Sequence, residues 1–446
     1  MTYEGNPYRA TLRREYPEPL IALLIFILGV WLWDHYFAKP AGYAPGTEAV
    51  AMLKMDRDLR LADVMERDPT WLRKLAAVET PEAARARALA VFQELANEKA
   101  MTLRGLEAFA VVKAVQQSQP VSATLGEMLK GRTISNFEEV SKQLANHGGT
   151  WWQAKIVDDW EKHAQPQTVW RQSYGEDSLK LRLRTVMARS AVWLLGLVGL
   201  FFLPRVFWHL GNAQKVKWKG YGAAWPFSLG FIVFLVATLA SIGFSLILEI
   251  IVRAVAEMPG WLWILADMAV RMVPIVIALA LLFRRTTHAI RVTGMAQPPD
   301  FRAVFGAFSL LMILDQGLRI LFKTASVTDP SGGLSLGDAG WWGLAYSVIS
   351  ACILAPVAEE TLYRGILFRT FWNRIGLVPA ALASSVIFSI LHFYDGYGLV
   401  SVWVFGFTCV ILYASGRSLL TVVALHMLYN SAIKIPEWVV YHWPLG

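Results

Sequence analysis

Residues 353–372 read ILAPVAEETLYRGILFRTFW, and this stretch decides which class of fold the chain adopts. It begins as apolar as a membrane span, yet it carries Glu359, Glu360 and Arg364 close together. An ionised side chain in the middle of a membrane helix costs about 3 kcal/mol even on forgiving insertion scales. Such side chains therefore face the inside of a helix bundle, where they pair with one another or mark a functional site.

The composition of the whole chain indicates a polytopic membrane protein. Of its 446 residues, 55% are hydrophobic and 17% are charged, whereas about 25% of the residues in a soluble domain are charged. The net charge of +8 comes from Lys and Arg that lie mostly in short loops between apolar runs, as the positive-inside rule describes. We therefore expect no nucleic-acid partner. The two cysteines lie inside apolar runs and support neither a disulfide framework nor a cysteine metal site.

Apolar runs of membrane length predict an all-α polytopic bundle of about 8–9 transmembrane helices. The first run, 19–37, belongs to an N-terminal region 1–39 and is interpreted as a signal anchor, because it is long and has no clear A-x-A site. A cleaved signal peptide is the alternative. Residues 185–340 are expected to hold additional transmembrane helices and 341–446 the last group of spans. The spans after the first are predicted at 188–210, 225–252, 261–283, 301–322, 341–372, 377–393, 399–414 and 419–435.

Residues 40–184 form a predicted soluble helical domain, inserted after the first span. Thr80 is expected to cap a helix that begins at Pro81, and Ser135 with Glu138 forms a capping box for another. The domain has no His, Cys and carboxylate cluster, so we interpret it as a surface for a protein partner or substrate. Loops rich and poor in Lys and Arg alternate, which predicts a plasma or inner membrane protein with a cytoplasmic N-terminus and this domain outside the cytoplasm.

Three short patterns of polar residues lie in the last group of spans. They are Glu359-Glu360-x-x-x-Arg364, Phe388-x-x-x-His392 and His426-x-x-x-Asn430. A spacing of four places two residues one turn apart on the same face of a helix. Glu360 can therefore pair with Arg364, while Glu359 points about 100° away around the helix axis.

The spacing of the first two patterns predicts that they meet. His392 follows Glu359 by 33 residues (392 − 359), and the midpoint falls at Gly376, where a helix-to-helix turn is expected. Residues equidistant from the turn of a helical hairpin lie at the same depth, about 20–25 Å from the turn in this case. A second turn near Arg417 brings His426 part of the way to that depth. A carboxylate and two imidazoles can thus converge inside the bundle.

Two kinds of chemistry suit this set of groups. A carboxylate beside an imidazole can remove a proton from water, and a second imidazole and an amide can donate hydrogen bonds to a developing oxyanion. Alternatively, Glu359, His392 and His426 could bind a divalent metal such as zinc and leave a position for water. Both routes hydrolyse an amide, and the sequence does not decide between them.

Two other charge pairs lie within predicted spans at the same spacing. They are Asp267 with Arg271 and Asp315 with Arg319. A single neutralised pair inside a membrane bundle is most often structural, so we interpret both as ion pairs that hold helices together.

The order and spacing of the three patterns resemble the CPBP family of intramembrane proteases, also called the CAAX protease and bacteriocin-processing or Abi family. The resemblance covers residues 341–435, roughly a fifth of the chain. It implies that Glu359 activates water with the help of His392, that Glu360 and Arg364 shape the site, and that His426 and Asn430 stabilise the tetrahedral intermediate. Members of the family are commonly called metalloproteases, and a metal-free glutamate mechanism has also been proposed for them.

The leading hypothesis is therefore an intramembrane endopeptidase acting on a peptide or membrane-protein substrate in or near the lipid bilayer. One alternative is a catalytically silent membrane scaffold or immunity protein that binds a partner through residues 40–184, although all six polar motif residues are present. Another is a proton-coupled transporter, which would also place ionisable residues inside its spans. A carrier often shows inverted repeats with broken helices, and the sequence shows none.

Overall fold

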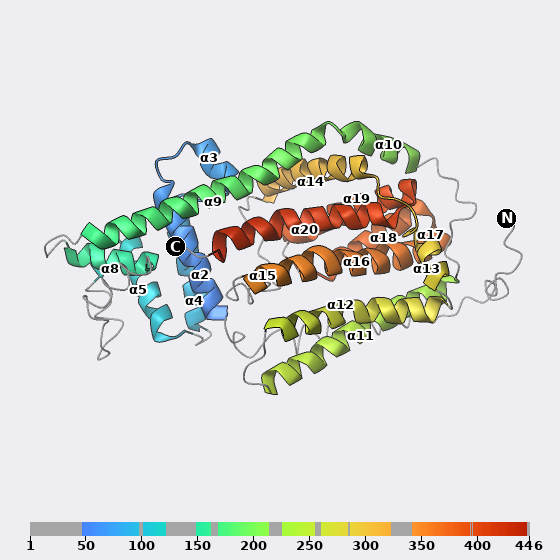
Figure 1. Ribbon diagram of the computed structural model, residues 1–446, viewed down its shortest axis with the longest axis horizontal. Coiled ribbons are helices and arrows are strands. Elements are labelled where there is room, and N and C mark those ends of the chain that lie inside the picture. Colours follow the sequence, from blue (N-terminus) through green and yellow to red (C-terminus); the bar gives the residue numbers. More distant parts are fainter. Residues whose placement is uncertain are drawn as a thin grey trace, which may run out of the picture. The chain divides into compact units, whose positions relative to one another are not determined.

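The computed structural model describes residues 47–97, 101–121, 149–161, 168–213, 225–254, 260–283, 286–322, 341–392, 394 and 396–443. Within these ranges every regular element is helical (Figure 1). Seven helices of the described part are long and apolar enough to cross a membrane, and the 14-residue helix α18 (Leu377–Ile390) is apolar but shorter. The prediction of an all-α polytopic membrane bundle is confirmed.

Most predicted spans correspond to observed helices, and the predicted first span, 19–37, lies outside the described residues. The prediction of one span at 188–210 is wrong, because helix α9 (Thr168–Leu200) ends at Leu200 and α10 (Leu203–Ala213) begins after a short turn. The seven candidate spans are Tyr174–Leu200, Phe227–Leu248, Ile264–Leu282, Phe301–Phe322, Gly343–Trp372, Gly396–Gly416 and Leu419–Tyr441.

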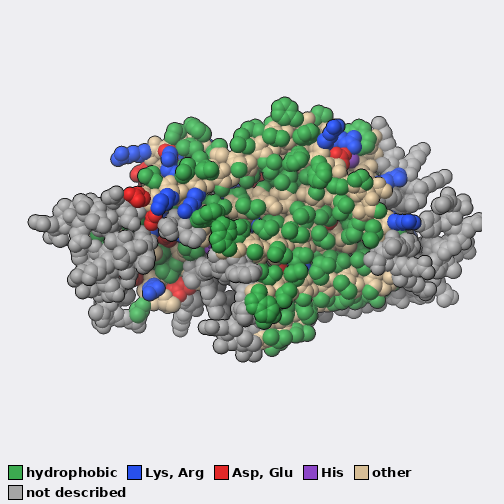
Figure 2. All heavy atoms as spheres, viewed as in Figure 1, with side chains coloured by type: hydrophobic (Ala, Val, Ile, Leu, Met, Phe, Trp, Pro, Cys, Tyr) green, Lys and Arg blue, Asp and Glu red, His purple; other side chains and the backbone are tan. Residues whose placement is uncertain are grey.

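The surface of these helices is suited to lipid. Figure 2 shows one face of the molecule, where hydrophobic side chains cover much of the visible described surface. Val276, Ile320 and Leu321, for example, are exposed by 60%, 79% and 72%. Apolar side chains exposed to this extent are stable when hydrocarbon surrounds them.

The chain divides into two compact units. Residues 194–331 and 344–434 belong to one, and 39–193, 332–343 and 435–446 belong to the other. The second unit contains α2 (Thr47–Val64), α3 (Thr70–Leu75), α4 (Pro81–Asn97), α5 (Leu103–Gln116), α8 (Trp151–Glu161) and most of α9. Its core gathers Phe92, Val111, Trp151 and Trp152. Helix α4 begins at Pro81, and the Thr80 hydroxyl accepts a hydrogen bond from the Ala83 N–H at 3.3 Å, as expected of a cap. The predicted capping box at 135–138 lies outside the described residues.

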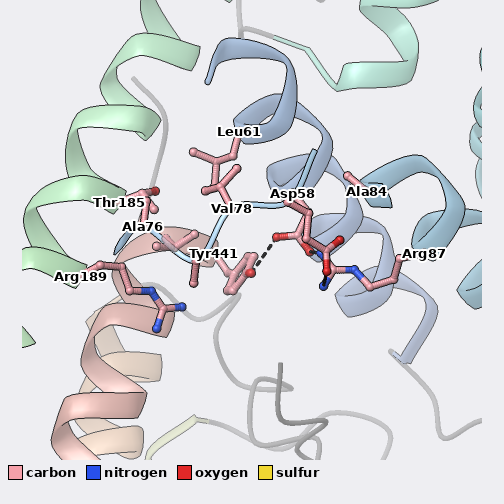
Figure 3. A pocket seen from close by; sticks show the side chains of 12 residues that line it. Asp58, Leu61, Ala76, Val78, Ala84, Arg87, Thr185, Arg189 and Tyr441 are labelled. Carbon is pink, nitrogen blue, oxygen red and sulfur yellow. Dashed lines mark hydrogen bonds and ion pairs between the residues drawn. The ribbon is translucent and has the colours of Figure 1, made fainter. Parts of the chain in front are cut away.

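A small polar pocket of the second unit surrounds Asp58 (Figure 3). The Asp58 carboxylate accepts a hydrogen bond from the Tyr441 hydroxyl at 2.7 Å and pairs with Arg87 at 3.0 Å. Arg87 also pairs with Glu79 at 3.1 Å. Burial raises the pKa of Asp58, while Arg87 and Tyr441 act in the opposite direction. These contacts join α2 and α4 to the end of helix α20 (Leu419–Tyr441).

The first unit is built from helices packed side by side, including α11 (Phe227–Ala254) against α12 (Gly260–Leu282) and α18 against α19 (Gly396–Gly416). Two glycines allow α14 (Phe301–Phe322) to pack closely against the chain around the end of α9. A Cβ on Gly199 would meet the Phe305 carbonyl, and one on Gly306 would meet the Phe202 carbonyl. Small residues commonly allow such close approach between membrane helices.

A polar cluster joins α10, α14 and α19 in this unit. His209 is 1% exposed, and its ring lies 2.7 Å from the Ser415 hydroxyl and 3.3 Å from Asp300. Asp300 also pairs with Arg205 at 2.7 Å. Burial lowers the pKa of His209 and outweighs the hydrogen bond that Asp300 accepts from the ring, which acts to raise it.

The predicted span 341–372 forms a continuous helical path, but only part of it is α-helical. In order, it consists of α15 (Trp341–Tyr346), the π-helix η3 (Ser347–Leu354), α16 (Ala355–Glu360), the π-helix η4 (Thr361–Phe368) and α17 (Arg369–Ile375). π-Helical turns are rare and occur frequently at functional sites. Glu359 and Glu360 lie on the short α-helix between these two π-helices.

The path ends at the turn that the sequence predicts. Helix α17 ends at Ile375, α18 begins at Leu377, and Gly376 between them has φ +83° and ψ 177°. This backbone conformation is essentially restricted to glycine. Gly376 therefore makes the sharp reversal that returns α18 alongside η4.

Candidate active site

A buried ion pair lies at the base of the site. Glu360 accepts a hydrogen bond from Arg364 Nη1 at 2.8 Å, and the side chains are 0% and 1% exposed. Arg364 Nη2 donates to the Gly406 carbonyl of α19 at 3.2 Å, and its guanidinium carbon lies 4.3 Å from the centre of the Phe388 ring. The pair predicted from the spacing of four therefore exists, and it also connects η4 to α18 and α19.

His426 reaches this pair from α20. Its Nδ1 lies 2.8 Å from Glu360 Oε1. A carboxylate oxygen accepts hydrogen bonds, so a neutral His426 ring that donates to Glu360 carries its proton on Nδ1. The ring also packs edge-on against Phe405, with centroids 4.8 Å apart. The Nε2 atom of His426 consequently carries a lone pair.

In His392, as in His426, Nε2 is the ring nitrogen that carries the lone pair. Helix α18 ends at Ile390, so His392 lies just beyond the helix. The predicted span 377–393, which placed His392 inside a helix, ends too late. Its Nδ1 is 2.7 Å from the Phe388 carbonyl, which can only accept a hydrogen bond. A neutral His392 ring therefore carries its proton on Nδ1 and a lone pair on Nε2.

Glu359 lies between the two rings. Its Oε2 is 3.9 Å from Nε2 of His392 and 3.9 Å from Nε2 of His426. This oxygen is buried and has no hydrogen-bond partner among the described residues, although 26% of the Glu359 side chain is exposed. Three electron-pair donors thus approach one another without a hydrogen between them. A water molecule or another proton donor at one side of these atoms could donate hydrogen bonds to them.

Asn430 lies on the same helix as His426 but makes a different contact. Its Nδ2 donates to the Ala351 carbonyl at 2.7 Å. In the π-helical pattern, that carbonyl would accept from the N–H five residues later, which is the position of Pro356, and proline has no N–H. Asn430 therefore satisfies a carbonyl that Pro356 leaves free. Among the described contacts, no hydrogen bond joins Asn430 to the other five predicted site residues.

We next tested whether Glu359, His392 and His426 fit a metal. The kinds of donor are suitable, and the Nδ1 contacts to a carbonyl and a carboxylate are typical of metal-ligating histidines. The spacing is less suitable, since tetrahedral zinc with bonds of about 2.1 Å holds its ligand atoms about 3.4 Å apart, against 3.9 Å here. Across the described residues, no group of three or more His, Cys, Asp or Glu is arranged to hold a metal ion. We therefore derive no step through a metal.

One further charge lies near Glu359 and was interpreted from the sequence as structural only. Arg271 Nε lies 2.8 Å from Asp267 Oδ2 and also donates to the Ser350 hydroxyl of η3 at 2.9 Å. Its guanidinium interacts electrostatically with Glu359. The spacing of four predicts the Asp267 pair, but no local signal predicts the contact with η3, because it depends on how α12 packs.

The other intramembrane pair lies elsewhere in the unit. Arg319 pairs with Asp315 at 2.8 Å, and Asp315 also accepts hydrogen bonds from the Tyr397 hydroxyl at 2.5 Å and from Ser401 at 3.1 Å. This carboxylate ties α14 to α19, which agrees with the structural interpretation of the pair.

Comparison with known proteins points to the same part of the chain. Residues 341–432 match the family model described as type II CAAX prenyl endopeptidase Rce1-like. The protein named "Putative membrane peptidase YdiL" of Bacillus subtilis (strain 168) is 32% identical over 90 residues, which are 20% of this chain and 36% of that protein. The chain thus matches about a third of the length of this relative. No solved structure matches. The resemblance seen in the motifs is confirmed for residues 341–432, which are similar to the type II CAAX prenyl endopeptidase Rce1-like family.

Proposed function

We propose that this protein is an intramembrane endopeptidase that hydrolyses a peptide bond in or near the bilayer. The position of Glu359 Oε2, buried, without a hydrogen bond and 3.9 Å from two imidazole nitrogens, is the observation that carries this proposal. The family match of residues 341–432 agrees with it.

In the proposed reaction, a water molecule approaches from one side of Glu359 and the two rings and hydrogen-bonds to them. Glu359, assisted by His392, accepts a proton from this water while the water oxygen forms a bond to the substrate carbonyl carbon. The carbonyl π electrons move to the oxygen, which becomes an oxyanion. The proton held by Glu359 then passes to the amide nitrogen as the carbon–nitrogen bond breaks, which releases an amine and a carboxylic acid.

Stabilisation of the oxyanion is assigned to His426 and Asn430. The neutral form of His426 has no proton on Nε2, so a hydrogen bond from this atom requires an imidazolium. Glu360 accepts from the opposite nitrogen of the ring at 2.8 Å and would stabilise that charge. Asn430 has a second N–H besides the one that the Ala351 carbonyl accepts.

A metal route is the alternative for the same residues. If a divalent ion is bound, Glu359, His392 and His426 would hold it, and it would supply a water of lowered pKa.

The test is turnover of a quenched fluorescent peptide library and of membrane-protein substrates by the purified full chain in lipid nanodiscs. Wild type is compared with Glu359→Gln and His392→Ala, and Asp315→Asn serves as a control that removes an intramembrane carboxylate elsewhere. We expect the first two variants to lose activity by a factor of about 10² to 10⁴, and the control to retain it. Equal turnover by Glu359→Gln and wild type would refute the assignment.

We also propose that the protein resides in the plasma or inner membrane with its N-terminus in the cytoplasm. In this arrangement, residues 40–184 lie outside the cytoplasm and offer a surface to a substrate or partner protein. The alternation of basic and neutral loops supports the proposal. Labelling of single cysteines introduced in the loops, with a reagent that does not cross membranes, tests it.

A further inference from the structure

Arg271 contributes a charge to the candidate site from outside the family-matched segment. It lies on α12, which packs against η3, α16 and η4. It interacts electrostatically with Glu359, whereas the family match begins at residue 341. A residue in this position can give the site a substrate preference that residues 341–432 alone would not provide.

The guanidinium of Arg271 is held by one edge only. Both of its hydrogen-bond contacts, to Asp267 and to Ser350, use Nε. Neither Nη1 nor Nη2 has a hydrogen-bond partner among the described residues. An arginine carries one N–H on Nε and four on the two Nη atoms, so four donors in a fixed planar arrangement remain available.

The exposure of the charged residues separates them into two groups. Glu360 and Arg364 pair with each other and are 0% and 1% exposed, so neither side chain is accessible to a substrate. Arg271 is 29% exposed, close to the 26% of Glu359 and of His392. The Arg271 side chain is therefore partly accessible, as those of Glu359 and His392 are.

Unused donors of Arg271, on a helix that packs against the Glu359-bearing helix α16, favour one class of ligand. A negatively charged substrate group that approached Glu359 alone would be repelled by it. The two Nη atoms of Arg271 match the geometry of a carboxylate and can bind it with two parallel hydrogen bonds. A neutral apolar residue would gain nothing from the same donors.

Building on the proposed function, we propose that Arg271 is a specificity-determining residue that binds a carboxylate of the substrate close to the cleaved bond. That carboxylate is supplied either by an acidic side chain or by the C-terminus of the peptide. Asp267 and Ser350 hold the guanidinium by Nε so that its other edge meets the substrate.

The test measures binding, so that it does not depend on turnover. Short apolar peptides with a reduced, uncleavable central bond carry one Glu or one Gln beside that bond, each with a free or an amidated C-terminus. Their dissociation constants are measured by fluorescence anisotropy with the full chain in nanodiscs. We expect wild type to bind a carboxylate-bearing peptide about tenfold more tightly than its neutral counterpart, and Arg271→Gln to bind both alike.

Controls separate binding by Arg271 from an effect on folding. Arg319→Gln removes the arginine of the other intramembrane pair and should keep the preference. Arg271→Lys should keep part of it, because an ammonium preserves the charge but not the two-pronged geometry. The double variant Asp267→Asn/Arg271→Gln leaves no unpaired Asp267 and should lose the preference as the single variant does.

The outcomes also separate this inference from the proposed function. Loss of preference on Glu→Gln assigns the carboxylate to a side chain, and loss on amidation assigns it to the C-terminus. Wild type that shows no preference, or Arg271→Gln that keeps it, overturns the inference even if peptides are cleaved. Wild type that shows the preference but cleaves no cleavable version supports the inference and refutes the endopeptidase. A uniform fall in kcat for all peptides in Arg271→Gln, with KM unchanged, would also overturn it in favour of a role at the oxyanion.

Discussion

Glu359 Oε2 lies 3.9 Å from His392 Nε2, and the two residues are brought together by a helical hairpin whose turn is Gly376. Neither atom is joined to the other by a direct hydrogen bond, since the separation exceeds the usual limit of about 3.2 Å. A water molecule that lies to one side of the line joining the two atoms can hydrogen-bond to both of them. In the proposed reaction that molecule is the attacking water.

Removal of metal ions is expected to leave turnover intact. The three candidate ligands are more widely spaced than tetrahedral zinc requires, as described above, and the carboxylate–imidazole route needs no ion. Turnover is measured before and after dialysis against a strong chelator, with a zinc peptidase as the positive control for chelation. Activity that disappears and returns on addition of zinc would contradict the expectation and favour the metal route.

Breaking the buried pair should destabilise the protein strongly. Glu360→Gln or Arg364→Met leaves one charge buried without its partner, which costs about 3–5 kcal/mol. The double variant should lose less than the sum of the two single variants, because it leaves no unpaired charge. Thermal unfolding of the four proteins in detergent, followed by intrinsic tryptophan fluorescence, measures the coupling. Additive effects would mean that the two side chains do not stabilise each other.

The contact between Asn430 and the Ala351 carbonyl should depend on Pro356. Asn430→Ala leaves a carbonyl without its partner and should lower the free energy of unfolding by about 1–3 kcal/mol. In a Pro356→Ala background, the new N–H at position 356 can serve that carbonyl, so the same substitution should cost less. Unfolding in both backgrounds is the measurement. A cost of Asn430→Ala that is identical with and without Pro356 would show that this carbonyl is not what Asn430 serves.

The His209 cluster predicts a loss of stability in mild acid. Burial holds the pKa of His209 below its ordinary value of 6.5, so the unfolded state binds the proton more readily than the folded state does. Stability is fully present above pH 6.5 and declines as the pH falls toward the folded pKa. The pKa of Asp300 is also lowered, but from 3.8, so its effect appears only in stronger acid.

The variant His209→Gln isolates this contribution. The difference in melting temperature between about pH 8 and about pH 5.5 should be larger for wild type than for His209→Gln. His209 is not a predicted site residue, so activity at neutral pH should change little in a variant that folds. A wild type whose melting temperature is equal at both pH values, or an equal difference in the two proteins, would be incompatible with a buried neutral His209.

Two regularities of the sequence predict much of the site. The helical repeat predicts the Glu360–Arg364 pair, and the position of Gly376 predicts that Glu359 and His392 meet. Neither regularity predicts that His426 contacts Glu360, because that depends on how α20 packs against η4 and α16. The same holds for Arg271, whose contact with Ser350 joins helices separated by 79 residues in sequence. The packing of helices that are far apart in sequence leaves no periodic pattern in the sequence of either helix.

The errors in the helix boundaries also have physical causes. Hydropathy marks 188–210 as one run, yet the chain turns at Phe201 and Phe202, because an apolar turn and an apolar helix have the same composition. The predicted span 377–393 ends too late for a similar reason. Its apolar run continues past the end of α18 at Ile390, and His392 lies beyond the helix.

The two π-helices that flank Glu359 and Glu360 have a consequence for how this protein can change over evolutionary time. A π-helical turn is an α-helical turn that accommodates one inserted residue. A single deletion within η3 or η4 could therefore be absorbed by conversion of the π-helical turn to an α-helical turn. A deletion within α16, which has no such turn, would rotate one half of the helix relative to the other by about 100°. Such a deletion would redirect the two neighbouring carboxylates away from their histidines. The π-helices on either side of α16 can therefore tolerate a change in residue number better than α16 itself can.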